Sequence, residues 1–263
     1  MVTAILVILL LLLIYFALVM PRVVDRPDVS YMLMRKFAHR GLHDENAPEN
    51  TLAAYSLAIE GGYGIEIDVR LTSDKVPVVF HDPTLQRMFG VDKKVSELTL
   101  EELKEYTFPG TKEKIPTFAE TLELVGDRAP LLIELKGEDA DMEVCGAVAD
   151  MLDAYSGVFA IQSFNPLHLR WMKQHRPQFV RGQLASKRNA EINPFLSFAL
   201  SQMLLNFLSR PDFASYNHKY RTPALGIFNL FGAPRFAWTL RDAETEEKVK
   251  ARFDNVIFEN YKA

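Results

Sequence analysis

The sequence predicts an α/β protein whose centre is a closed TIM (β/α)8 barrel of eight parallel strands, preceded by one transmembrane helix. From residue 37 onward, short runs rich in β-branched and aromatic residues alternate with helical patterns, which is typical of parallel sheets built from strand–helix units. Eight such runs fit a closed barrel, which commonly has about 250 residues in a single domain. The first 20 residues differ from the rest because they are almost all apolar.

The apolar segment 2–20 has the length and composition of a membrane-spanning helix. Only Thr3 interrupts it, and at about 1.5 Å per residue it extends roughly 28 Å, close to the thickness of the hydrocarbon layer. A cleaved signal peptide would instead have a basic start, a shorter apolar core and a small-x-small cleavage site. No Lys or Arg precedes the segment, whereas Arg22, Arg26, Arg35 and Lys36 follow it. The positive-inside rule therefore predicts a single-pass membrane protein whose larger domain lies in the cytoplasm.

Residues 21–36 are polar and contain prolines, so we expect a short tether before a barrel domain at 37–263. The barrel strands are expected at residues 37–40, 64–68, 130–136, 158–163, 179–184, 212–216, 235–240 and 255–259, with helices between them, for example at 50–60, 117–125 and 166–175. No helix is expected after the last strand. Residues 30–36, or another part of the chain, would cover the barrel there.

A ninth β-like run, at residues 76–81, cannot be the next parallel strand. Only residues 72–75 separate it from the preceding strand, and a parallel crossover needs about a dozen residues. We therefore expect the second strand to continue through Leu71, turn, and return as an antiparallel arm that brings His81 to the rim of the barrel. The following excursion is expected to contain a capped short helix at 99–106.

The stretch 194–208 is unusually apolar, but it is too short to span a bilayer. We expect it to form an outer helix between the fifth and sixth barrel strands. The alternative is a helix that dips into the lipid beside the N-terminal segment and helps to admit lipid-like molecules.

Ionisable residues stand at the ends of several predicted strands, where buried strands rarely carry them without a chemical reason. Glu66 and Asp68 lie two residues apart, so they share one face of their strand, and Glu134 repeats the arrangement on another strand. Three carboxylates suit a hard divalent cation, Mg²⁺ or Ca²⁺. The formal net charge is −4 and no basic block occurs, which argues against nucleic acid as a partner.

These residues belong to an ordered set of motifs that resembles the glycerophosphodiester phosphodiesterase family. The motifs are AHRG at 38–41, PENT at 48–51, GIEIDVRL at 64–71, VVFHD at 78–82, LIELK at 132–136, QSF at 162–164 and AWT at 237–239. They extend over roughly residues 37–260. A single tripeptide would be weak evidence, whereas the ordered set is strong.

The resemblance implies a metal-dependent hydrolase that cleaves glycerophosphodiesters to glycerol 3-phosphate and an alcohol. His39 and His81 would be the acid and base, since an imidazole titrates near neutral pH and can take and return a proton. Glu66, Asp68 and Glu134 would hold the cation, the alternative being a set of salt bridges at the rim. Both the neighbouring glycerol hydroxyl and water remain open as the attacking nucleophile.

Three further residues are candidates for substrate binding. Lys136 would contact a phosphate oxygen, with a structural ion pair as the alternative. Arg40 would either do the same or pair with Glu49. Trp238 would line the pocket, as a tryptophan does in the family, or pack in the core. We expect residues 49–51 to start a helix rather than take part in catalysis.

At one place the chain departs from the family pattern. Relatives often have a Thr-Asp pair near the last strand, where this chain has Phe258, Glu259 and Asn260. The contacts at that part of the rim therefore do not follow from the resemblance.

Two other functions remain open. The apolar segments 2–20 and 194–208 favour a lysophospholipase D acting on lysophospholipids. A membrane-tethered protein that binds phospholipid headgroups without turnover is a third reading. Such a protein would be expected to have lost a catalytic histidine or a metal carboxylate, and this chain has all five of these residues.

Overall fold

The computed structural model describes residues 1–137, 142–187 and 193–263. Eight parallel strands pair side by side and close into a ring, because the first strand also pairs with the second and the last. They are β1 (Phe37–His39), β2 (Gly64–Leu71), β4 (Leu131–Leu135), β5 (Phe159–Ser163), β6 (Arg181–Ala185), β7 (Phe213–Asn217), β8 (Arg235–Leu240) and β9 (Asn255–Phe258). The predicted TIM barrel is confirmed.

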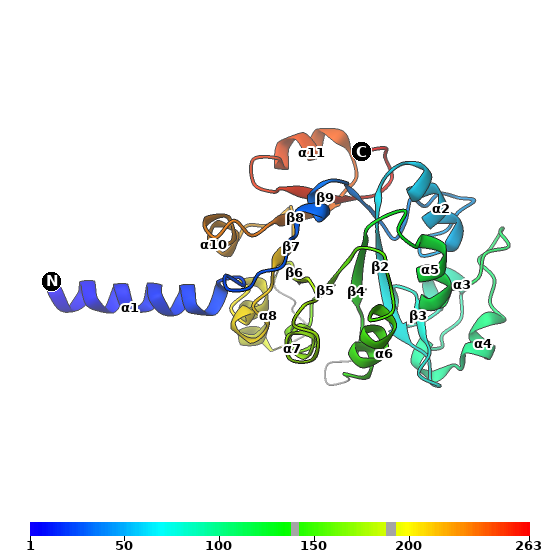
Figure 1. Cartoon of the computed structure of the whole chain (residues 1–263), viewed down its shortest axis with the longest axis horizontal. Coiled ribbons are helices and arrows are strands. Elements are labelled where there is room, and N and C mark those ends of the chain that lie inside the picture. The colour runs from blue at the N-terminus through cyan, green and yellow to red at the C-terminus, as the bar shows by residue number, and fades with distance from the viewer. Residues whose placement is uncertain (138–141, 188–192) are drawn as a thin grey trace.

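Helices connect the strands on the outside of the ring (Figure 1). They are α2 (Leu52–Glu60), α5 (Phe118–Val125), α6 (Glu143–Leu152), α7 (Pro166–His175), α8 (Pro194–Ser201), α9 (Asn206–Ser209), α10 (Ala224–Leu230) and α11 (Ala243–Val249). Side-chain oxygens of Thr51, Thr117, Asn165 and Asp242 accept backbone N–H groups at the starts of α2, α5, α7 and α11.

The predicted antiparallel arm is present as β3 (Pro77–Val79). It pairs with the C-terminal part of β2, in the register Val69 with Val79 and Leu71 with Pro77, and on its other side Val78 forms an isolated antiparallel bridge with Thr117. After it come α3 (Gln86–Phe89), a 3-10 turn η2 (Val95–Glu97) and α4 (Leu100–Lys104), which share a small apolar core of their own. The capped helix predicted at 99–106 is α4, and it is shorter than expected.

The base of the barrel is filled by inward-facing apolar side chains. Phe37, Phe213 and Phe236 are fully buried there and meet edge to face, with ring centroids 5.2–6.1 Å apart. The 3-10 helix η1 (Ser30–Leu33) places Met32, also fully buried, against this cluster. The segment 30–36 therefore lies across the base instead of covering the side of the barrel at β9.

The outer side of β9 is covered by aromatic side chains. The ring of Phe258 lies 4.8 Å from that of Tyr63 and 5.4 Å from that of Tyr261, measured between centroids. The Tyr63 hydroxyl also donates to the backbone oxygen of Ala263 at 3.0 Å. These contacts hold residues 261–263 against the outer side of β9.

The N-terminal helix α1 (Val2–Val19) projects from the barrel (Figure 1), and its end contacts α9 and α10. It is long and apolar enough to cross a membrane, with a mean hydropathy of 3.2 over 18 residues and 6% of them buried. Only its last turn packs on the barrel, where Val19 is buried. Asn206 and Arg210 donate hydrogen bonds to the backbone oxygens of Val19 and Ala17, at 3.1 and 2.8 Å.

The apolar stretch at 194–208 forms two helices, which corrects the expectation of one. The first, α8, ends at Ser201, and the second, α9, begins at Asn206. Met203 between them has a φ of 58°, a left-handed conformation that cannot continue a helix. Both elements still lie outside the barrel, between its fifth and sixth strands.

Candidate active site

Three carboxylates meet inside the C-terminal rim of the barrel. Glu66 and Asp68 alternate with outward-facing Ile67 on β2, and the register of the neighbouring strand places Glu134 beside Asp68. The three residues are almost completely buried, with 2%, 1% and 6% of their surface exposed. One ligand atom from each lies within 4.8 Å of the other two. Such an oxygen-only set suits a hard divalent cation.

The electrostatics of the three carboxylates also favour a cation. Burial raises the pKa of Glu66 well above its usual range, and the charges of Asp68 and Glu134 add to this effect. Burial raises the pKa of Glu134 as well. Burial opposes the ionisation of Asp68 too, but Lys136, His81 and Arg40 outweigh it and hold the pKa of Asp68 below its usual range. The cationic side chains thus favour the ionised form of Asp68 more than that of Glu66 or Glu134, and a divalent ion would add the positive charge that favours ionisation of all three carboxylates.

The two predicted cations lie beside these carboxylates. The Nζ atom of Lys136 is 2.6 Å from Oε1 of Glu134 and 3.1 Å from Oδ1 of Asp68; the second contact is an ion pair that is not aligned as a hydrogen bond. Arg40 donates to Glu49 at 2.8 Å, and its Nε lies 3.5 Å from Oδ2 of Asp68. The pairing of Arg40 with Glu49 is therefore formed, and Arg40 faces the site as well.

The backbone after β1 is held against the same cluster. The N–H of Arg40 donates to Oε2 of Glu66 at 3.1 Å, with Arg40 at a φ of 60°. Gly41 follows at a φ of 83°, and a Cβ there would lie 2.9 Å from the Cβ of Ala54 on α2. Only glycine fits both the backbone conformation and this close approach.

Each of the two candidate histidines has one ring nitrogen bound by a carboxylate. Nδ1 of His39 lies 2.6 Å from Oε2 of Glu259, and Nδ1 of His81 lies 2.6 Å from Oδ1 of Asp82. The β3 arm places His81 beside Asp68, because the N–H of Phe80 donates to the Asp68 backbone oxygen at 2.9 Å. A carboxylate on Nδ1 keeps the proton there in the neutral imidazole and leaves the lone pair on Nε2. Burial lowers the pKa of His81, which favours that neutral form.

Trp238 on β8 is half-buried, and its ring meets Phe164 edge to face at 5.5 Å. Its indole Nε1 is buried, and among the residues that the structure describes it has no hydrogen-bond partner. Both sequence-based readings thus have support: the ring packs against a neighbour, and the N–H is left to be satisfied by a bound molecule.

The arrangement can be compared with known proteins. The model of the glycerophosphoryl diester phosphodiesterase family matches residues 39–261, most of the chain. The chain belongs to this family. It is therefore a hydrolase of phosphoric diesters, as the resemblance implied.

Named relatives are similar over much of the chain. A glycerophosphodiester phosphodiesterase of Caldanaerobacter subterraneus is 36% identical over 161 residues, which is 56% of this chain and 65% of that relative. The glycerophosphodiester phosphodiesterase structure from Thermotoga maritima is 30% identical, with a TM-score of 0.66, and the match covers 84% of this chain and 92% of that one. A phosphodiesterase from Oleispira antarctica, solved with the product sn-glycerol-3-phosphate, is 27% identical, with a TM-score of 0.73, covering 88% and 94%.

Several residues of this phosphodiesterase that contact the site were missed by the sequence reasoning. Glu259, where the family pattern does not hold, is the partner of His39 and is also bound by Arg241. Asn50, expected only to start a helix, is buried and donates to Oδ2 of Asp68 at 2.9 Å, while Thr51 alone caps α2. A sequence signal existed for Gln162, which stands inside a quoted motif and whose amide approaches Glu66 at 3.4 Å.

Proposed function

We propose that this phosphodiesterase hydrolyses glycerophosphodiesters to glycerol 3-phosphate and an alcohol, with a divalent cation held by Glu66, Asp68 and Glu134. The observation that carries the proposal is the placement of two carboxylate-bound histidines beside three buried carboxylates whose ligand atoms lie within 4.8 Å of one another. The Oleispira phosphodiesterase with sn-glycerol-3-phosphate supports the substrate class.

The proposed chemistry uses the two imidazoles on opposite sides of the phosphorus. One histidine takes the proton of the attacking hydroxyl at Nε2 as the new P–O bond forms. The other, which must start as the doubly protonated imidazolium, gives a proton from Nε2 to the oxygen of the leaving alcohol as the old P–O bond breaks. Attack by water gives glycerol 3-phosphate directly, whereas attack by the neighbouring glycerol hydroxyl gives a cyclic phosphodiester that water then opens with the roles of the two histidines exchanged. Both nucleophiles remain open. Glu259 and Asp82 orient the two rings.

Three positively charged groups would contact the phosphoryl oxygens of the substrate. A bound Mg²⁺ or Ca²⁺ would neutralise the negative charge that develops on these oxygens. Arg40 and Lys136, both largely buried beside the carboxylates, would bind the same oxygens from the protein side. The Trp238 N–H is a further donor for the substrate.

The test is a product assay. The full-length chain in detergent is incubated with glycerophosphocholine, glycerophosphoethanolamine, glycerophosphoglycerol and lysophosphatidylcholine, and glycerol 3-phosphate and free alcohol are measured. We expect glycerol 3-phosphate from the first three substrates. Binding of these diesters without any product would instead favour the non-catalytic headgroup-binding protein.

We also propose that α1 anchors the enzyme in a membrane with the barrel on the cytoplasmic side. The four cations that follow α1, at Arg22, Arg26, Arg35 and Lys36, support this orientation. The packing of the last turn of α1 on α9, with hydrogen bonds from Asn206 and Arg210, supports a helix that stays with the folded domain rather than one removed as a signal sequence. Labelling of the variants Val2→Cys and Met34→Cys in sealed vesicles with a membrane-impermeant thiol reagent would test the orientation, since the two residues lie on opposite sides of the membrane if α1 spans it.

One observation favours the second candidate, lysophospholipase D activity. The helix α8 precedes α9, on which the last turn of α1 packs, and it exposes large apolar side chains, with Phe195 85% exposed, Leu196 45% and Phe198 40%. Beside an anchored α1 this surface would touch lipid and bring the rim of the barrel to lysophospholipids in the membrane.

A further inference from the structure

A pocket of about 180 Å³ opens beside the carboxylate site, between the β2–β3 hairpin, the excursion after β3 and the end of β4. Four cationic side chains line it, from Arg70, Lys75, Lys94 and Lys136, together with the hydroxyls of Thr72 and Ser96. None of its eleven lining residues is acidic. Nothing in the proposed mechanism uses this pocket, apart from Lys136 on its border.

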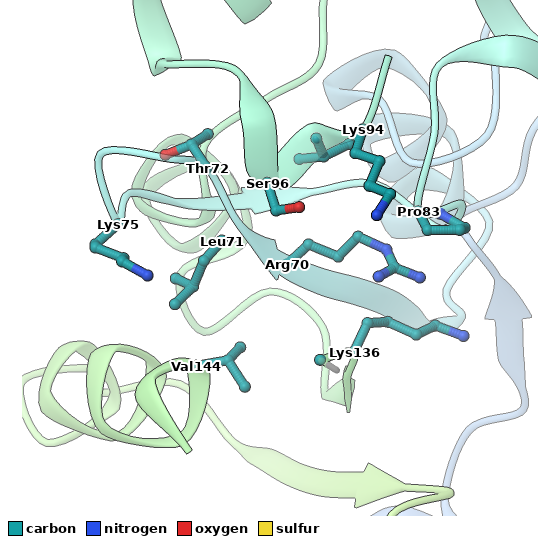
Figure 2. A pocket seen from close by; sticks show the side chains of 11 residues that line it. Arg70, Leu71, Thr72, Lys75, Pro83, Lys94, Ser96, Lys136 and Val144 are labelled. Atoms are coloured by element: carbon teal, nitrogen blue, oxygen red, sulfur yellow. The ribbon is translucent and has the colours of Figure 1, made fainter. Parts of the chain in front are cut away.

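The cations of the pocket are arranged around a common space. In Figure 2 the ammonium group of Lys94 points toward the guanidinium of Arg70, and Lys136 extends below them, while Lys75 lies toward the other end. Cationic groups gathered around one space create a positive potential there that attracts an anion. Among the residues that the structure describes, no ion pair involves Lys94, whereas Lys75 pairs with Glu143 and Lys136 with Asp68 and Glu134.

The pocket is joined to the candidate active site through two of its residues. Arg70 donates twice to the backbone oxygen of His81, from Nε at 2.9 Å and from Nη2 at 2.7 Å, which fixes the guanidinium next to a candidate catalytic residue. Lys136 touches both the pocket and the carboxylates. A molecule that reacts between His39 and His81 would therefore reach the pocket with the part that lies on the His81 side.

We propose that this pocket binds an anionic group, a phosphate or carboxylate, carried by the alcohol part of the diester. The inference rests on the proposed function. The glycerol part of the substrate carries only hydroxyl groups besides the reacting phosphate, so a second anion has to belong to the alcohol. The enzyme would then prefer diesters with an anionic alcohol over those with a neutral or cationic one.

A matched pair of substrates tests this preference. Glycerophosphoinositol and glycerophosphoinositol 4-phosphate differ by one phosphate group, and kcat/KM for each is measured with the wild type, Lys94→Gln and the control Lys93→Gln. Lys93 is exposed and does not line the pocket. We expect the wild type to favour the phosphorylated diester, and Lys94→Gln to lower that preference about threefold to tenfold, chiefly through KM. Lys93→Gln should keep the wild-type preference.

Equal kcat/KM for the two diesters in the wild type, or an equal loss on both in Lys94→Gln, would overturn the inference. If the wild type hydrolyses neither diester, the proposed function fails first. Calorimetric binding of inorganic phosphate then tests the pocket alone: weaker binding in Lys94→Gln than in Lys93→Gln supports it, and equal binding refutes it.

Discussion

Nδ1 of His39 on β1 lies 2.6 Å from Oε2 of Glu259, which directly follows β9, although 220 residues separate them in the chain. The contact forms because β1 and β9 are neighbours where the barrel closes, so the ends of the two strands meet at the rim. Arg241, after β8, holds the other oxygen of the same carboxylate. Glu259 thereby fixes both the orientation and the tautomer of a candidate catalytic imidazole.

Replacing Glu259 with Gln should lower kcat by about tenfold to a hundredfold, because the amide cannot hold the His39 ring and its proton as the carboxylate does. Steady-state kinetics on glycerophosphocholine measures the effect. Glu259→Asp, which keeps the carboxylate on a shorter side chain, should recover part of the rate, and KM should change little in either variant. A wild-type kcat in Glu259→Gln would show that the contact with His39 has no part in turnover.

The carboxylate of Glu259 should make the free energy of unfolding depend on pH. Burial alone would raise the pKa of Glu259, but hydrogen bonds and charge from His39 and Arg241 outweigh it and lower the pKa from 4.5 to about 2. Ionised Glu259 thus stabilises the fold fully above its unfolded pKa, and this contribution is lost as the pH falls from about 4.5 toward 2. The melting temperatures of wild type and Glu259→Gln should differ most at neutral pH and converge below pH 4.5. A difference that stays constant from pH 7 to pH 3 contradicts the prediction.

The two histidines should be required for turnover and not for folding. His39→Ala and His81→Ala are each expected to lower kcat by about 10²- to 10⁴-fold, the usual scale for an acid or base group. The control is His175→Ala, since His175 is an exposed residue at the end of α7. Melting curves recorded beside the rates separate lost chemistry from lost structure. If one variant keeps a near wild-type rate, that histidine is neither the acid nor the base.

Much of the fold could be predicted because it depends on local patterns. The period of two along β2 places Glu66 and Asp68 on one face, and the short connection at 72–75 already required β3 to be antiparallel. Because the C-terminal ends of barrel strands meet at one rim, the sequence also predicts that His39, His81 and Glu134 lie close together, and this prediction does not depend on how side chains pack. The expected strand boundaries differ from those observed by only a few residues.

The remaining features depend on contacts between distant segments or on backbone conformations that the sequence pattern does not reveal. The partner of His39 is one of two acidic residues in the last ten, and only barrel closure selects it. The residue type of Asn50 predicts a helix cap, whereas its side-chain amide donates a hydrogen bond to the buried carboxylate of Asp68. The left-handed Met203, which divides the stretch 194–208, has no glycine or proline to mark it.

The apolar side chains of α8 should matter for substrates held in a membrane. Changing Phe195, Leu196 and Phe198 to Ser is expected to reduce activity on lysophosphatidylcholine in vesicles and to spare water-soluble glycerophosphocholine, because these side chains are exposed. Met34→Ser is the control, since Met34 is 81% exposed near the base of the barrel. Equal losses on both substrates, together with a lower melting temperature, would assign the three side chains to the packing of the barrel.

The metal-dependent reaction is tested most directly by measuring glycerol 3-phosphate release from glycerophosphocholine before and after treatment with excess EDTA. The three buried carboxylates predict that chelation abolishes most of the activity and that added Mg²⁺ or Ca²⁺ restores it. Glu66→Gln, Asp68→Asn and Glu134→Gln should each match the chelated enzyme, and added cation should not restore full activity to them. Full activity in excess EDTA would contradict the account.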